Sequence, residues 1–174
     1  MSRGHPPRAG DREAALALFD EKRAWLPRVG HYNVSGSWDI LIHVIEGLVV
    51  LGEQSQAAQL YPLVHELVDT GTLAFWPRCR LTHTIAGLAA GAAHQWEAAE
   101  DHFRVALQQA GSFPSCLEQA EVRRFHAMML LDRAIPGDRE KAQILLGEAL
   151  ESYTLIGMSR HMELTQALMQ RAAA

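Results

Sequence analysis

The stretch GDREAALALF (residues 10–19) returns in modified form as GDREKAQILL (residues 137–146), and this repetition decides the predicted fold. Both copies place an alanine five residues after the glycine and a bulky apolar residue four positions after that alanine. Residues three or four positions apart lie on one face of an α-helix. Each copy is therefore predicted to open an amphipathic helix, and the two are predicted to be the first and last copies of one repeating unit.

Two interior segments carry the same pattern, which gives four copies in all. A small residue takes the same place in each copy, at intervals of 43, 41 and 43 residues: Ala15, Ala58, Ala99 and Ala142. A bulky apolar residue follows four positions later in three copies, as Phe19, Phe103 and Leu146, whereas Pro62 interrupts the second. A period near 42 residues with two helices per unit is typical of an α-solenoid, whose units bury their apolar faces against neighbouring units.

The predicted fold class is therefore all-α, an α-α superhelix of about four two-helix units. Apolar periodicity and helix-breaking residues predict eight helices and no convincing β-strand. Pro62 falls inside the third helix, where it is expected to bend the axis. Residues 1–10 are expected to form a flexible leader and residues 11–174 a single domain. The predicted helices span roughly 11–26, 37–51, 54–68, 81–92, 96–110, 117–133, 138–156 and 159–171.

Composition narrows the possible partners of the chain. It has 174 residues, of which 48% are apolar and 21% charged, as is usual for a globular protein. Its formal net charge is −4 and it has no Lys/Arg-rich run, so nucleic acid is not expected as a partner. Its apolar stretches are too short to cross a membrane, and no secretion signal opens the chain, so a cytoplasmic location is expected. Cys79 and Cys116 lack metal-ligand spacing and are expected to be free, mostly buried thiols, although a disulfide between them stays open.

A resemblance to a known repeat family rests on the third copy. Gly87, Ala99, Phe103 and Ala106 have the mutual spacing of the glycine, alanine, aromatic and alanine positions of the tetratricopeptide repeat. The fourth copy keeps the later positions but has Leu130 where the glycine is expected, and the period exceeds the standard 34 residues. The resemblance implies a tetratricopeptide-like helical repeat.

The C-terminal third also resembles a known class of protein. Residues 137–169 are similar to the closing unit of the C-terminal helical-repeat region of large bacterial regulators, such as ATP-dependent LuxR-type activators and AAA proteins linked to cyclases or kinases. This resemblance implies a regulatory or scaffolding module. The first predicted helix matches the second member of a pair, and no first member precedes it. Its apolar face, with Ala15 and Phe19, would then need another partner, so we expect either a longer parent protein or self-association through this helix.

Nine histidines raise the question of a metal or catalytic site. His43 and Glu46 lie one helical turn apart, but a metal needs further ligands, and a helix-surface histidine near a glutamate is usually solvated. No nucleophile-elbow or phosphate-loop pattern is present. The sequence therefore predicts no metal, no cofactor and no enzymatic activity.

A candidate binding surface follows from the repeat. In tetratricopeptide-like solenoids the first helix of each pair lines the concave face, and such a strip could hold an acidic or C-terminal peptide through charge-assisted hydrogen bonds. The alternative is that half of the residues on this strip pack in the interior and the rest lie on a solvated face. One aligned row contains His43, Thr84 and His126, and neighbouring positions add Trp38, Arg80, His83 and Arg123.

Two functional classes remain at this point. The preferred one is a non-catalytic interaction module that recognises a protein or peptide segment within a larger regulator. The other is a small-molecule sensor, for example of a sugar, in which Trp38, Trp76 or Trp96 would stack on the ligand. A closed, aromatic-lined pocket would favour the sensor, and an open groove with basic residues would favour the peptide.

Overall fold

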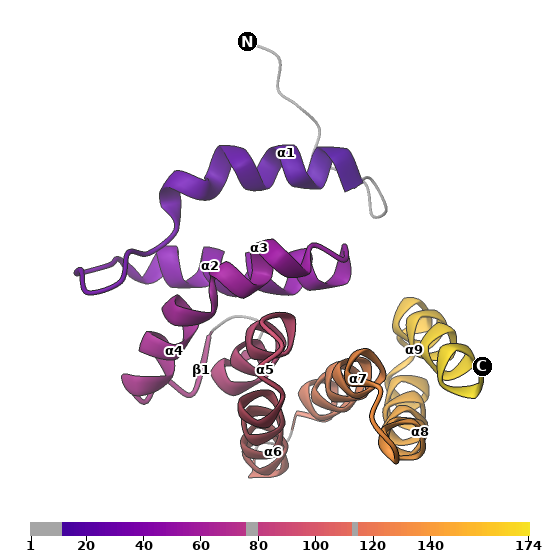
Figure 1. Cartoon of the computed structure of the whole chain (residues 1–174). Helices are drawn as coiled ribbons and strands as arrows, with labels where there is room; N and C mark the ends of the chain where they lie inside the picture. Colours follow the sequence, from indigo (N-terminus) through magenta and orange to yellow (C-terminus); the bar gives the residue numbers. More distant parts are fainter. Residues whose placement is uncertain (1–11, 76–79, 113–114) are drawn as a thin grey trace.

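The computed structural model describes residues 12–75, 80–112 and 115–174, and these parts of the chain are predominantly helical (Figure 1). The predicted all-α class is confirmed, whereas the leader over residues 1–10 lies outside the described residues. A short 3-10 helix, η1 (Arg23–Trp25), follows the first α-helix. Within the described ranges the α-helices are α1 (Arg12–Lys22), α2 (Ser35–Val50), α3 (Gln54–Gln59), α4 (Tyr61–Asp69), α5 (Thr82–Ala92), α6 (Trp96–Ser112), α7 (Cys116–Arg133), α8 (Asp138–Ile156) and α9 (Ser159–Ala173).

The single bent helix expected over residues 54–68 is instead two helices, α3 and α4, that meet at Leu60. Pro62 lies at the start of α4. A proline is well tolerated there, because the first backbone N–H groups of a helix have no partner within the helix. The proline therefore starts a new helix and does not bend an existing one.

The expectation of no strand is also wrong in one detail. Two-residue strands β1 (Ala74–Phe75) and β2 (Arg80–Leu81) pair in antiparallel fashion. The backbone N–H of Thr82 donates to the carbonyl of Leu73 at 3.0 Å, just beyond the ladder. This small ladder fixes the chain directly before α5 and so holds Arg80 at the start of that helix.

The helices pack mainly on their neighbours in chain order. α5 packs on α6, α6 on α7, α7 on α8 and α8 on α9 (Figure 1). Contacts also reach beyond the next helix, because α2 touches α5, α5 touches α7, and α7 touches α9. One apolar core runs through nearly the whole row, from Phe19 to Ala172.

The buried small residues differ from the predicted set at two positions, because Ala15 of α1 and Ala58 of α3 are only half-buried. Ala99 and Ala142 are fully buried, as expected of helix-packing positions, but in the second copy Ala57 is fully buried and Ala58 only half-buried. The bulky residue four positions after Ala57 is Tyr61, which is also buried. Pro62 therefore does not interrupt the pattern. In this copy the pattern starts at Ala57, one residue earlier than the sequence suggested.

Two glycines in helix interiors offer a test of local helix stability. A Cβ added at Gly47 in α2 or at Gly147 in α8 would meet no atom within 4 Å. Because alanine loses less backbone entropy than glycine in a helix, Gly47→Ala and Gly147→Ala should each raise the free energy of unfolding by about 0.5–1 kcal/mol. Chemical denaturation measures this change, and a loss of stability at either position would contradict the open space beside that glycine.

Candidate functional site

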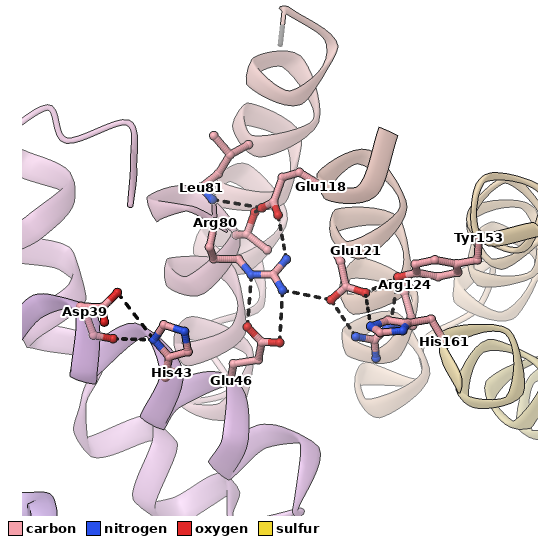
Figure 2. Close-up of polar contacts among 11 residues, drawn as sticks. Asp39, His43, Glu46, Arg80, Leu81, Glu118, Glu121, Arg124, Tyr153 and His161 are labelled. Carbon is pink, nitrogen blue, oxygen red and sulfur yellow. Dashed lines mark hydrogen bonds and ion pairs between the residues drawn. The ribbon is translucent and has the colours of Figure 1, made fainter. Parts of the chain in front are cut away.

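Arg80, the first residue of β2, lies among three carboxylates that come from two helices (Figure 2). Its Nε and Nη2 atoms donate to Glu46 of α2 at 3.1 and 3.2 Å, and its Nη1 atom donates to Glu118 of α7 at 2.7 Å. Nη2 also donates to Glu121, one turn further along α7, at 3.2 Å. The Arg80 side chain is only 14% exposed. Arg80 therefore links α2, the start of α5, and α7.

Glu118 connects α7 to the beginning of α5. Its Oε1 atom accepts hydrogen bonds from the Leu81 backbone N–H at 3.1 Å and from the Thr84 hydroxyl at 2.7 Å. Its own backbone N–H donates to the side chain of Ser115, the residue that caps α7. The first turn of α7 is thus held against α5 by polar contacts.

Glu121 extends the same set of contacts to the C-terminal helices. Arg124 donates to it at 2.9 Å, and the hydroxyl of Tyr153 in α8 also donates to it. His161 of α9 lies 3.6 Å from the Glu121 carboxylate. We call Glu46, Arg80, Glu118, Glu121, Arg124, Tyr153 and His161 the Arg80 network.

Burial and charge oppose each other throughout this network. Desolvation acts to lower the pKa of the Arg80 guanidinium, but the surrounding carboxylates outweigh it, so that pKa is raised. Burial acts to raise the pKa of Glu121, and Arg124 and Arg80 reverse this, so that carboxyl has a lowered pKa. Burial raises the pKa of Glu118 despite the opposing effect of Arg80. The positive charges of Arg80 and Arg124 are therefore balanced by carboxylates of the chain itself.

The structure does not bring the predicted concave row together. His43 is exposed on α2, where its Nδ1 atom donates to the Asp39 carbonyl at 2.7 Å. Thr84 and His126 are buried in the core. The expected row therefore joins one surface residue to two interior ones.

The neighbouring predicted residues are also separated from one another. Arg80 belongs to the network described above, and Trp38 is half-buried against the core. Arg123 donates to Glu148 at 2.5 Å and to the Gln119 carbonyl at 3.1 Å. His83 contacts His102 of α6. These arginines are engaged by groups of the chain itself.

His83 belongs to a separate cluster of rings between α4, α5 and α6. Its Nδ1 atom lies 3.0 Å from Nδ1 of His102, and the Tyr61 hydroxyl lies 3.3 Å from Nε2 of His102. Burial, with a contribution from His83, lowers the pKa of His102 to about 4, and burial also lowers the pKa of His83. Both rings are therefore neutral at pH 7. Within the described residues no group of three or more His, Cys, Asp or Glu side chains is placed to hold a metal ion.

His126 is a buried imidazole with no hydrogen-bond partner for either ring nitrogen among the described residues. Its ring stacks on Phe103 with centroids 5.2 Å apart. Burial is the largest cause that lowers its pKa to about 4; the charges of Lys141 and Arg133 lower it further, whereas Glu100 and Asp138 act to raise it. Protonation of this ring therefore opposes folding.

His126 should make the protein sensitive to acid. Because its folded pKa lies below the unfolded value near 6.5, its contribution to stability is fully present above pH 6.5 and is lost as the pH falls toward 4. Between pH 7 and pH 5 the wild type should lose about 2 kcal/mol more stability than His126→Phe, which keeps the stack on Phe103. Urea denaturation at both pH values measures the difference, with exposed His43→Gln as the control. Parallel losses in wild type and His126→Phe would contradict the assignment.

A groove of about 400 Å³ lies between α1 and α2. Its α2 side extends from Asp39 to Leu51, which at the helical rise of 1.5 Å per residue is a length of about 18 Å. Its polar rim consists of Lys22, Asp39 and His43. We call this the α1–α2 groove, and its apolar lining is Ala15, Leu16, Leu18, Phe19, Ile40, Val44, Gly47, Leu48 and Leu51.

The tryptophans proposed for a sensor do not line this groove. Trp38 packs elsewhere on the core, and Trp96 lies beside His94 at the edge of a second, more polar cavity. Trp76 lies outside the described residues. Cys116, expected to be buried, is instead an exposed free thiol, and Cys79 lies outside the described residues.

The carboxylates of the Arg80 network were not among the residues predicted from the sequence. A local signal for them does exist, because Glu118, Glu121 and Arg124 recur every third residue along one face of α7. No helix in the described parts of the chain is both long and apolar enough to span a membrane. No protein-family model matches the chain, and no curated protein or solved structure matches it at a significant level.

Proposed function

We propose that the chain is a non-catalytic protein-interaction module, a tetratricopeptide-like solenoid within a larger, cytoplasmic bacterial signalling or transcription regulator. The corrected helix positions support the repeat. Ala15, Ala57, Ala99 and Ala142 are separated by 42, 42 and 43 residues, a more regular spacing than the sequence alone suggested.

Polar contacts between residues about one period apart support the same architecture. If units of near-equal length stack side by side, residues one period apart become neighbours. Four side-chain contacts join residues 41 positions apart: Arg12 with Glu53, Tyr61 with His102, Arg80 with Glu121, and Glu100 with Lys141.

The observation that carries the interaction function is a series of exposed apolar residues along α1, η1 and the loop to α2, which we call the apolar surface. Trp25 is 61% exposed, and Leu18, Val29 and Val34 are also exposed there. Exposed apolar side chains that gather on one part of a surface mark sites of protein–protein contact. This surface adjoins the α1–α2 groove, to which Leu18 itself contributes.

Selection of a phage-displayed random peptide library on the immobilised chain tests this function. We expect an enriched family of peptides whose binding is lost in the Leu18→Glu, Trp25→Glu double variant. Leu155→Glu is the control, because Leu155 is an exposed apolar residue on α8, far along the row of helices. No enriched family, or equal binding by all three proteins, would refute the interaction function.

The size of the α1–α2 groove favours a second candidate, the small-molecule sensor. Small-molecule sites commonly have volumes of roughly 300–1,000 Å³ and mostly apolar walls, and this groove meets both criteria. Thermal shifts against a metabolite panel that includes sugars test the sensor. A shift that disappears in Gly47→Leu, which places a side chain in the groove, would favour the sensor over the interaction module.

A further inference from the structure

We infer that the α1–α2 groove receives an amphipathic helix of a partner protein, with lysine or arginine beside the apolar face of that helix. The inference rests on the proposed interaction function and names the chemistry of the partner. It reverses the expectation from sequence of an acidic peptide held by basic residues.

The shape of the groove fits a helix. Its walls are two helices whose lining residues recur with helical spacing, at 15, 18, 19 and 22 on α1 and at 40, 44, 47 and 51 on α2. Its length of about 18 Å corresponds to about 12 residues of a third helix. Partner helices commonly bind such grooves through apolar side chains at every third or fourth position.

Gly47 provides the space for close approach at the middle of the α2 wall. A Cβ at Gly47 would meet no atom within 4 Å, so the surface beside it is open. Figure 1 shows α1 standing apart from α2 along this side of the molecule. A helix that enters here would cover Leu18, which is otherwise exposed.

The charges at the groove favour a cationic partner. Asp39 is the only carboxylate among the lining residues that the structure describes, and its side chain is 46% exposed. The lining ammonium of Lys22 is already paired with Glu21 at 2.7 Å. Along α2, Asp39 and His43 lie beside Glu46 of the Arg80 network (Figure 2). In that network the three carboxylates Glu46, Glu118 and Glu121 exceed the two guanidinium groups Arg80 and Arg124 by one negative charge.

The same charges disfavour a second copy of the chain as the occupant. The chain has a formal net charge of −4, and two copies joined through this groove would bring equivalent Asp39 rims together. Like charges at an interface oppose association. A basic amphipathic helix meets no such repulsion.

Two synthetic helical peptides of about 18 residues test the inference. Both have leucine along one face; one has lysine and the other glutamate along the edges of that face. Fluorescence anisotropy measures their binding to the full chain at physiological salt. We expect the lysine-edged peptide to bind at least about tenfold more tightly than its glutamate-edged twin, and a scrambled lysine peptide to bind weakly.

Matched variants locate the binding. Gly47→Leu fills the groove and should weaken binding of the lysine-edged peptide at least about tenfold, whereas Gly147→Leu, the same change on α8, should leave it unaltered. Asp39→Lys should abolish the preference for the lysine-edged peptide. Glu163→Lys makes the same change in charge on α9 and should preserve that preference. Circular dichroism confirms that each variant is folded, and the Asp39 pair provides the test if Gly47→Leu does not fold.

Three results would overturn the inference. They are equal or tighter binding of the glutamate-edged peptide, indifference to both Gly47→Leu and Asp39→Lys, and a dimer in sedimentation that Gly47→Leu dissociates. If the lysine-edged peptide fails to bind while phage-selected peptides bind this apolar surface, the inference of a basic helix is wrong but the interaction function stands. If neither kind of peptide binds, the interaction function fails with it.

Discussion

Replacement of Arg80 by methionine is expected to lower the free energy of unfolding at pH 7 by about 3–5 kcal/mol. Methionine keeps the length and apolar stem of the side chain but removes the cation that Glu46, Glu118 and Glu121 share. Removal of one partner from a buried ionic cluster leaves the remaining charges desolvated and unpaired. Chemical denaturation measures the loss.

Arg123→Met is the matched control for this substitution. Arg123 pairs with a single carboxylate, Glu148, whose side chain is 50% exposed. Exposed pairs of this kind contribute about 0–1 kcal/mol. A loss in Arg80→Met no larger than in Arg123→Met would show that Arg80 does not hold the helices together.

The Arg80 substitution should also have a characteristic pH dependence. Without the guanidinium, the folded-state pKa of Glu118, which burial already raises, should rise further, and the pKa of Glu121 should lose part of what lowers it. A raised folded pKa favours the folded state at low pH and disfavours it as the pH increases through that pKa. Arg80→Met should therefore be less destabilised at pH 5 than at pH 8. An equal deficit at the two pH values would assign the loss to packing and not to charge.

Phe103→Ala should cost about 3–5 kcal/mol, the range for removal of a large buried aromatic side chain. Phe103 is fully buried on α6, and its ring packs against Gly87 of α5 and stacks on His126 of α7. It thus joins three successive helices. A loss below about 1 kcal/mol in denaturant would show that the ring is not central to their packing.

Gly87 should be coupled to Phe103. A Cβ at Gly87 would lie 2.9 Å from the Phe103 ring, closer than the two can approach, so Gly87→Ala should cost about 1–3 kcal/mol. In the Phe103→Leu background the same change should cost less, because leucine vacates part of the ring's position. A double-mutant cycle measures this coupling, and additive effects would contradict direct contact between the two residues.

The sequence predicted the helical packing where the pattern was unambiguous. Ala99, Phe103 and Ala106 are all fully buried, as their spacing on one helical face requires. In the second copy Ala57 and Ala58 are adjacent alanines, and their order along the chain does not reveal which one faces the core. Only the packing of α5 against α3 and α4 distinguishes them.

The candidate site was less predictable because its contacts are distant in sequence. The carboxylate partners of Arg80 lie 34, 38 and 41 positions away, on helices whose relative rotation a local pattern does not specify. The sequence pointed to Arg80 and Arg123 as residues that would bind a partner. In the structure both arginines instead donate to carboxylates on helices of the same chain. The α1–α2 groove also depends on how far α1 stands from α2, which is a property of tertiary packing.

Amide hydrogen exchange with and without the lysine-edged peptide tests the central claim most directly, because it locates the binding surface along the chain. We expect slower exchange in α1 and α2 when the peptide is present and unchanged exchange in α8 and α9. Protection confined to α7–α9, or no protection of α1 and α2 at saturating peptide, would contradict a helix-binding surface at this end of the molecule.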